Sequence, residues 1–377
     1  MIAATTPVQR SPDSRLLMVD SVGQITHLPR RSFPNLLRSG DVVIANDAAT
    51  LPASLFGTHR RTGARIEVRL AGRRSLDPEA VSCFSAIVFG DGDYRMPTEY
   101  RPSPPELHAG DTLQLGSLHA TVTGLLDHPR LVVLCFGGSA EEIWRGLARE
   151  GRPIQYAHVL TPLAICDTWT PVAGPLAAYE PPSAGFILNW STLDAMIRRG
   201  VQFGTLTHAA GISSTGDAEL DARLPFDEPY RIPKSTASLV REARRYGGRV
   251  IAIGTTVVRA LEHVAASDGS VRAGEGVATQ RIGRGTMLRV VDAIVSGTHE
   301  PGTDHYELLR AFVNDAVLAK MSEQLAEYRY RTHEFGDSIF IERQLSPAST
   351  IGYSGGESHV EYLTIGRTHN GLALKHV

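Results

Sequence analysis

Short continuous runs of apolar residues recur along the chain, and most of them end in glycine or in polar residues. Four runs have the composition of strands that are covered on both faces. They occupy residues 41–47, 201–208, 250–253 and 290–295. Apolar residues at helical spacing predict helices at residues 140–150, 191–199, 236–246 and 304–325. Buried strands that alternate with helices predict an α/β domain with a parallel sheet.

The middle of the chain has a different pattern, in which apolar and polar residues alternate. The alternating segments lie at residues 66–70, 84–89, 112–115, 119–125 and 131–136. Short strands of this kind, separated by glycine, proline and aspartate, are typical of a small antiparallel barrel or sandwich. A β-rich unit therefore interrupts the α/β pattern. After about residue 343 the chain is rich in serine and glycine, with a weak strand pattern at residues 359–365.

Residues 248–262 combine a buried strand, a glycine turn and the start of a helix. Gly254 lets the backbone turn tightly, and Thr255 or Thr256 is placed to cap the helix that carries Arg259. Free backbone N–H groups at such a helix start attract an anion. The same turn also serves as plain architecture in many α/β proteins, so both interpretations stay open.

Polar residues follow each of the predicted buried strands. They are Asn46, Asp47, His208, Gly254, Thr255, Thr256 and His299. Ligands of open α/β sheets bind beyond the carboxyl ends of the strands, so these residues would line one cleft if the strands are neighbours. His208 and His299 suit a general acid or base because histidine titrates near neutral pH. The alternative is that they are loop histidines bonded to the backbone.

Two further groups of residues also have two interpretations. Asp292 is a carboxylate in an otherwise apolar run, where a buried charge needs a partner. A structural ion pair and a catalytic role are both open for it. Tyr330, Arg331 and Asp337 lie in a segment with several aromatic and basic residues. This segment suits contact with a base or a ribose, or it is an ordinary loop.

Composition narrows the possible classes of protein. The 377 residues include 38 Lys and Arg against 40 Asp and Glu, for a net charge of −2, so a polyanionic partner would have to bind at local patches. Cys83, Cys135 and Cys166 are far apart and not at metal-ligand spacing, so we expect no metal site and a reducing cytoplasm. The chain lacks the pattern of a signal peptide and of a membrane span, so we expect no membrane partner.

Five segments, in order along the chain, carry a family resemblance. They are residues 40–57, 182–186, 249–262 and 290–301, and the segment from Tyr330 to Asp337. Together they resemble the S-adenosylmethionine:tRNA ribosyltransferase-isomerase family of queuosine biosynthesis. The resemblance implies a main α/β domain with an inserted small antiparallel β-barrel domain. We expect the main domain at residues 1–57 and 151–345, the barrel domain at 58–150 and a C-terminal tail at 346–377.

The resemblance also implies a reaction. The ribosyl part of S-adenosylmethionine moves to the aminomethyl group of a 7-deazaguanine in tRNA, and adenine and methionine leave. The sugar rearranges to an epoxycyclopentane, so the reaction needs a base and an acid. S-adenosylmethionine is then a substrate, no metal is expected, and we expect a cytoplasmic monomer that binds tRNA.

The expected site residues follow from the same resemblance. The catalytic candidates are His299, Asp47 and His208. The candidates for binding S-adenosylmethionine are Asn46, Gly185, Gly254, Thr255, Thr256, Arg259 and Asp292. The candidates for binding the other substrate are Glu228, Tyr230, Arg331 and Asp337.

The chain departs from the family pattern at several positions. Ala49 and Ser54 stand where the family has arginine, and Ile187 and Phe226 stand where it has histidine. Missing arginines remove contacts suited to phosphate or carboxylate. Two alternatives therefore stay open. One is a divergent paralogue that uses S-adenosylmethionine on a small acceptor or cleaves it without tRNA. The other is a non-catalytic relative that only binds the ligand.

Overall fold

The computed structural model of the chain describes residues 1–344. The expected tail at 346–377 and the weak strand pattern at 359–365 lie outside the described residues. Residues 1–344 form one compact unit. No helix within it is long and apolar enough to cross a membrane.

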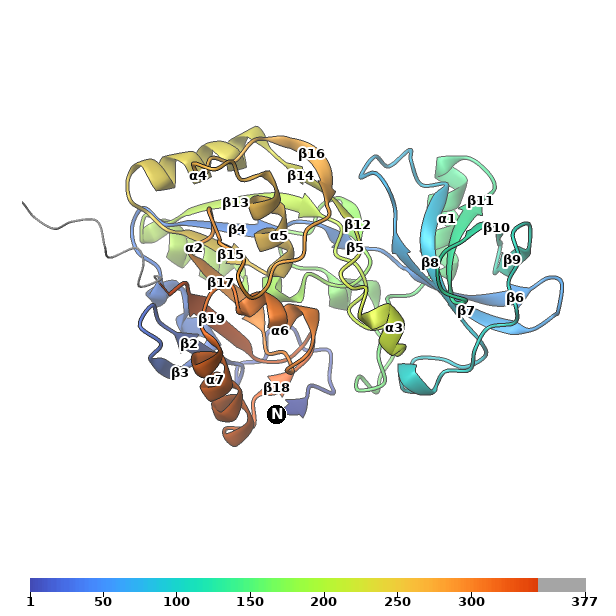
Figure 1. Cartoon of the computed structure of the whole chain (residues 1–377), viewed down its shortest axis with the longest axis horizontal. Helices are drawn as coiled ribbons and strands as arrows, with labels where there is room; N and C mark the ends of the chain where they lie inside the picture. The colour runs from blue at the N-terminus through green and yellow to red at the C-terminus, as the bar shows by residue number, and fades with distance from the viewer. Residues whose placement is uncertain (345–377) are drawn as a thin grey trace, which may run out of the picture. The chain divides into compact units, whose positions relative to one another are not determined.

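The core of the main domain is a nine-stranded mixed sheet (Figure 1). Its order is β16 (Gly274–Ala278), β14 (Glu228–Ile232), β13 (Gln202–His208), β4 (Val42–Asn46), β15 (Val250–Ile253), β17 (Ala293–Gly297), β19 (Ser338–Glu342), β2 (Arg15–Val19) and β3 (Ile25–Pro29). The four predicted buried strands β13, β4, β15 and β17 are adjacent and parallel. Their carboxyl ends therefore meet at one edge, which is the condition for a shared cleft.

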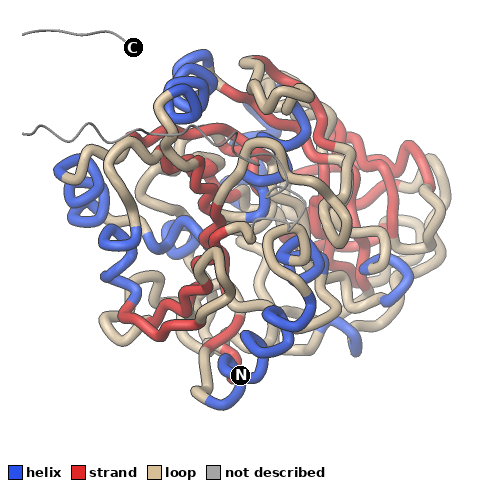
Figure 2. The backbone as a smooth tube through the Cα atoms, turned by 60° about the vertical axis from the view of Figure 1, so that its left-hand side comes forward, coloured by secondary structure: helices blue, strands red, loops and turns tan. Residues whose placement is uncertain are grey.

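Helices cover both faces of this sheet (Figure 2). On one face Val42 and Ile44 of β4 pack in a core with α4 (Lys234–Arg245), α5 (Thr255–Val264) and α7 (Asp315–Glu327). On the other face Val43 and Ala45 pack with η1 (Arg30–Leu36), η4 (Ser183–Ile187) and α2 (Trp190–Arg198). Because successive side chains of a strand point to opposite faces, a strand covered on both sides reads as a continuous apolar run.

The inserted unit is a closed antiparallel barrel. Its strands are β6 (Ser54–His59), β7 (Arg65–Gly72), β8 (Cys83–Phe89), β9 (Thr112–Leu115), β10 (Leu118–Leu125) and β11 (Leu131–Phe136), followed by α1 (Ala140–Glu150). The barrel closes where β6 pairs with β9, which excludes the sandwich alternative. The predicted fold class is confirmed. The first barrel strand spans the expected domain boundary at 57, since β6 continues the chain from the main domain without a break.

Cys83 and Cys135 form a disulfide between β8 and β11, and Cys166 is free and exposed. The spacing of the cysteines along the chain did not predict this pair. They are 52 residues apart, and only the antiparallel register of β8 and β11 places them directly opposite each other.

Three helix predictions need correction. The long helix expected at 304–325 is two helices, α6 (Asp304–Leu309) and α7, because Asn314 caps a new helix by accepting from the backbone N–H of Val317. Helix α2 begins at Trp190 and not at residue 191, because Asn189 caps it by accepting from the backbone N–H of Thr192. Helix α5 has Gly254 at its N-cap, so neither threonine caps it. The remaining short elements are β1 (Ile2–Ala3), β5 (Ala49–Thr50), η2 (Thr98–Tyr100), η3 (Ile165–Thr168), β12 (Leu176–Ala178), α3 (Ala218–Asp221) and β18 (Arg331–Thr332).

Candidate active site

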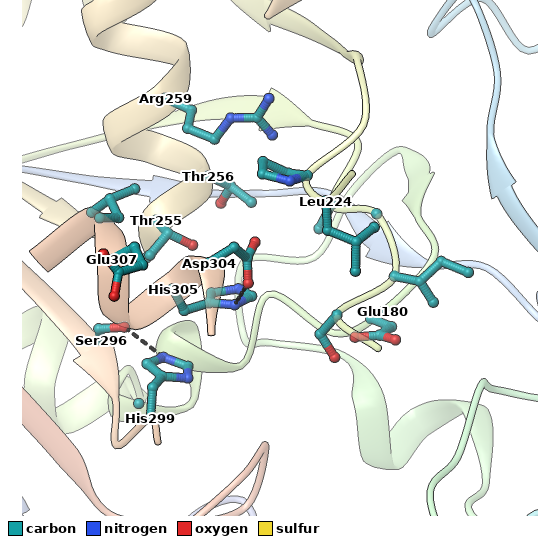
Figure 3. Close-up of a pocket in the computed structure, with 18 of the residues that line it drawn as sticks. Glu180, Leu224, Thr255, Thr256, Arg259, Ser296, His299, Asp304, His305 and Glu307 are labelled. Carbon is teal, nitrogen blue, oxygen red and sulfur yellow. Dashed lines mark hydrogen bonds and ion pairs between the residues drawn. The ribbon is translucent and has the colours of Figure 1, made fainter. Parts of the chain in front are cut away.

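A cavity of about 340 Å³ lies beyond the carboxyl ends of β15 and β17 (Figure 3). This volume falls within the range of about 300–1,000 Å³ that is usual for small-molecule sites. Segments far apart in the sequence form its wall, including η4, the start of α5 and α6. The structure brings several predicted residues together in this lining: Glu228, Gly254, Thr255, Thr256, Arg259 and His299.

The start of α5 forms one side of the cavity. Gly254 has a φ of 97°, a conformation that glycine adopts without strain and that L side chains rarely adopt. No side chain caps the helix at this end, so the first N–H groups of α5 are free to face the cavity. The hydroxyl of Thr256 accepts a hydrogen bond from Asn46 Nδ2 at 3.3 Å. The helix start can therefore receive an anionic group.

A buried ion pair lies beside this helix start. The guanidinium of Arg259 pairs with Glu228 and also donates to the carbonyls of Phe226 and Ala278, each at 3.2 Å. Glu228 accepts a further bond from the backbone N–H of Gly211 at 2.6 Å. Burial raises the pKa of Glu228 to about 7, with Arg259 acting in the opposite direction. Glu228 can thus change protonation state near neutral pH.

Two stacked histidines form the opposite part of the lining. His299 lies against His305, with ring centroids 4.7 Å apart, and its Nε2 is 3.0 Å from the hydroxyl of Ser296. Burial lowers the pKa of His299 to about 3, and His305 adds to this effect. Burial also lowers the pKa of His305, but the carboxylate of Asp304, 2.8 Å from Nδ1, outweighs it and the net shift is upward. The site therefore pairs a neutral histidine with a neighbour that favours the cation.

Glu180 adds a carboxyl group on a different side of the cavity (Figure 3). Its side chain accepts a hydrogen bond from the hydroxyl of Tyr156. Burial raises the pKa of Glu180 to about 7, and Glu334 raises it further. Pairs of titratable groups with pKa values pushed apart are a signature of acid–base chemistry.

Three predicted residues lie next to the cavity but do not line it. Asn46 Nδ2 donates to the carbonyl of His208 at 2.9 Å, and its Oδ1 accepts from the His208 N–H at 3.0 Å. Asp47 accepts from the hydroxyls of Thr205 and Thr207 at 2.9 and 2.7 Å. These bonds join β4 to β13 behind the site. They give both side chains hydrogen-bond partners within the protein, so neither needs a ligand as a partner.

His208 is fully buried, and its Nε2 lies 3.7 Å from Glu228 Oε2. Neither ring nitrogen has a hydrogen-bond partner among the described residues. Burial lowers its pKa well below the usual range, and Arg259 adds to this. His208 is thus a neutral histidine beside the Arg259–Glu228 pair, and it reaches the cavity only through that pair.

The structure places the remaining predicted residues elsewhere. Asp292 lies at the amino end of β17, where it accepts from the N–H of Val250 and from Arg343, both at 2.9 Å. This is the structural ion pair that the sequence left open. Asp337 pairs with Arg15 at 2.9 Å and with Arg331 at 3.4 Å, which holds β18 and β2 together. Neither Asp337 nor Arg331 lines the cavity.

Tyr230 and Gly185 serve packing. Tyr230 is buried on β14, with its ring 5.6 Å from that of His263. A Cβ on Gly185 would lie 2.8 Å from the Thr170 methyl group, so close packing of η4 requires glycine there. Its neighbours Ser183 and Ala184 line the cavity instead.

Sequence reasoning missed Glu180, Asp304 and His305. Asp304 and His305 fall at the start of the helix predicted at residues 304–325, and nothing in that pattern marked them as site residues. Glu180 lies in the long proline-rich connection between α1 and α2, and loops of that kind often carry functional residues. Its position next to Pro181 and Pro182 gave no signal of burial. Among the described residues, no group of three or more His, Cys, Asp or Glu side chains is placed to hold a metal ion.

Comparisons with known proteins agree on one family. Residues 1–341 match the queuosine biosynthesis protein family. The chain is 32% identical to the S-adenosylmethionine:tRNA ribosyltransferase-isomerase of Ralstonia nicotianae, over 91% of this chain and 92% of that protein. It is 30% identical to the protein of the same name from Geobacter sulfurreducens, over 90% of this chain and 96% of that protein.

A solved structure of an S-adenosylmethionine tRNA ribosyltransferase from Thermotoga maritima aligns with 90% of this chain and 96% of that chain, at 23% identity and a TM-score of 0.47. The assignment rests on the sequence matches, which extend over nearly the whole described unit. The chain belongs to the queuosine biosynthesis protein family.

Proposed function

We propose that this protein transfers and isomerises the ribosyl part of S-adenosylmethionine onto a 7-aminomethyl-7-deazaguanine in tRNA, with release of adenine and methionine. The observation that carries the proposal is the pairing, in one cavity, of neutral His299 with the Asp304–His305 pair. The match to relatives named for this activity over about nine-tenths of the chain supports it.

The charges of the cavity suit S-adenosylmethionine, which carries a carboxylate, an ammonium group and a sulfonium. The uncapped start of α5 is a place for the carboxylate. Glu180 is a buried and Asp304 a half-buried carboxyl group in the same lining, and they would favour the two cationic groups. Thr255 and Thr256 supply hydroxyls within the same wall.

The histidines would divide the proton transfers. His299 is unprotonated at neutral pH, so its ring is free to take the proton from the carbon beside the sulfonium, and its lowered pKa makes it a weak base for that step. His305 is held toward its cationic form by Asp304, so it can donate a proton to the departing adenine. The stacked rings would also keep the roles separate, because a cation at His305 disfavours a second cation at His299.

None of the four departures from the family pattern, Ala49, Ser54, Ile187 and Phe226, lines this cavity. Ala49, Ser54 and Ile187 are buried. Ser54 instead donates to Glu67 inside the barrel at 2.8 Å. The departures therefore leave in place the lining residues on which this proposal rests. We further propose a monomer, and tRNA as substrate implies the cytoplasm.

The test is to incubate the purified protein with S-adenosylmethionine, alone and with precursor-modified tRNA, and to follow adenine and methionine by mass spectrometry. We expect release of both only when the tRNA is present. Release without tRNA would instead identify a small-molecule enzyme. Binding of S-adenosylmethionine without release in either case would identify a binding protein.

A further inference from the structure

A second hollow of about 620 Å³ lies where the barrel meets the loops around β14 and β16. It is lined by residues just after β7 and by residues just before β14 and along and after β16. We call it the arginine groove, after its four guanidinium groups: Arg73, Arg74, Arg223 and Arg281. Pro225 and Arg281 also line the active-site cavity, so the two hollows adjoin.

The arginine groove carries a clear excess of positive charge. Among its lining residues Asp227 is the one carboxylate. Arg223 is already paired with Glu219. Arg74 and Arg281 are exposed and form no ion pair with any described residue. A hollow lined by charge of one sign concentrates ligands of the opposite sign.

Arg73 gives the second, independent observation. It is only 5% exposed, and its Nη2 donates to the carbonyl of Leu176 at 2.9 Å. Its Nε and Nη1 have no hydrogen-bond partner, and no carboxylate pairs with it, among residues 1–344. Burying a guanidinium without a counter-ion is unfavourable. An anion in the groove would supply the missing charge.

We propose that the arginine groove binds the phosphate backbone of the tRNA on the side of the nucleotide that enters the active site. This inference rests on the proposed function. An enzyme that acts on a base takes it out of the stack, so the neighbouring phosphates must lie at the mouth of the cavity. Guanidinium groups match phosphate geometry with two parallel hydrogen bonds. The ring of Phe226, which also lines the groove, offers a surface for a neighbouring base.

The closing experiment compares two charge reversals, Arg74→Glu in the groove and Arg241→Glu on the exposed face of α4. Both change the net charge equally. We expect Arg74→Glu to raise KM for precursor-modified tRNA by about tenfold at low salt. We also expect it to reduce the slope of log affinity against log salt by about one. Arg241→Glu should do neither, and both variants should bind S-adenosylmethionine like the unchanged protein.

A second variant, Arg73→Gln, tests whether Arg73 contributes to tRNA binding or only to the stability of the fold. The glutamine removes the buried charge, and its amide nitrogen ends about where Nε of Arg73 lies, so the bond from Nη2 to the Leu176 carbonyl is also removed. We expect weaker tRNA binding and a smaller salt slope, with a melting temperature that is not lowered. A lower melting temperature with an unchanged salt slope would mean that Arg73 supports the fold only, which would overturn its role in the proposal.

The outcomes distinguish the groove from the function. If the unchanged protein turns over tRNA but Arg74→Glu and Arg241→Glu behave alike, the groove is wrong and the function stands. If the unchanged protein neither binds nor modifies tRNA, both fail. If Arg74→Glu weakens binding of free inorganic phosphate as much as binding of tRNA, the groove is a general anion site and not an RNA surface.

Discussion

Charged and titratable residues lie at both ends of the central parallel strands, but their surroundings differ between the two ends. At the amino ends, Arg249 pairs with Asp41 at 2.6 Å and also with Glu342. Asp292 pairs with Arg343 at the same end. At the carboxyl ends, the titratable groups of the cavity are buried or half-buried, and their pKa values are moved toward or away from neutrality. These are Glu180, Glu228, His299 and His305.

This difference distinguishes residues that stabilise the fold from residues that could take part in the reaction. At the amino ends, ion pairs between carboxylates and arginines hold loops and strands in place. At the carboxyl ends, groups have perturbed pKa values even where they are paired, as Glu228 is with Arg259, and such groups concentrate at functional sites. Asp292 and His299 flank the same strand, β17 (Ala293–Gly297), yet only His299 faces the cavity.

The largest expected effect tests the carboxyl end. His299→Ala should lower tRNA-dependent adenine release by about 10²–10⁴-fold, because positioned proton transfer contributes that much. The rate is measured by mass spectrometry under single-turnover conditions. Binding of S-adenosylmethionine and the melting temperature should stay close to those of the unchanged protein. Unchanged release would falsify the assignment of His299 as the base.

The second prediction tests the buried Arg259–Glu228 pair that borders the cavity. Arg259→Met removes the cation and leaves Glu228 buried without its partner, so at alkaline pH, where Glu228 is ionised, we expect a loss of about 3–5 kcal/mol in the free energy of unfolding. Urea unfolding measures it. The matched control is the double variant Arg259→Met/Glu228→Gln, which should recover part of the loss because no charge is stranded. Equal losses in the single and double variants would mean that the pair is not coupled.

The sequence predicts those features of the strand ends that depend on neighbouring residues in the chain, and it does not predict those that depend on distant ones. The apolar runs predicted the four parallel strands, and the polar residues at their ends predicted the edge where the cavity lies. The sequence did not reveal that Asp292 precedes its strand, because the run at 290–295 was read as beginning before the carboxylate. The structure begins β17 at Ala293. A shift of three residues moved Asp292 from inside the strand to the far edge.

Long-range contacts account for the other misses. Asn46, Asp47 and His208 lie at the ends of strands as expected. The side chains of Asn46 and Asp47, however, are hydrogen-bonded to residues of β13. Such bonds depend on strand order, which the sequence alone does not give. Glu180 is recognised as a candidate site residue only in the folded structure, where it is buried and accepts a hydrogen bond from Tyr156.

The third prediction concerns how the rate depends on pH through His305 and its partner Asp304. Asp304 holds the pKa of His305 above its usual value against the effect of burial. The cation is therefore present below that raised pKa and is lost as pH rises through it, so kcat/KM should fall on the alkaline side. Asp304→Asn should move this alkaline limb to lower pH. His299 should add no acid limb at any pH well above about 3. An alkaline limb that stays in place in Asp304→Asn would exclude His305 as the acid.

The smallest expected effect lies at the amino end, and it completes the comparison. Asp292→Asn keeps an oxygen that can accept from the Val250 N–H but loses the charge that pairs with Arg343. The two side chains are each 25% exposed, so solvent already screens the pair, and we expect a loss of about 1 kcal/mol or less in unfolding free energy. Release of adenine at saturating substrate should not change, because Asp292 lies at the opposite end of β17 from His299. A large fall in the rate without a fall in stability would show that the amino ends of these strands also take part in the chemistry, and the division between the two ends would not hold.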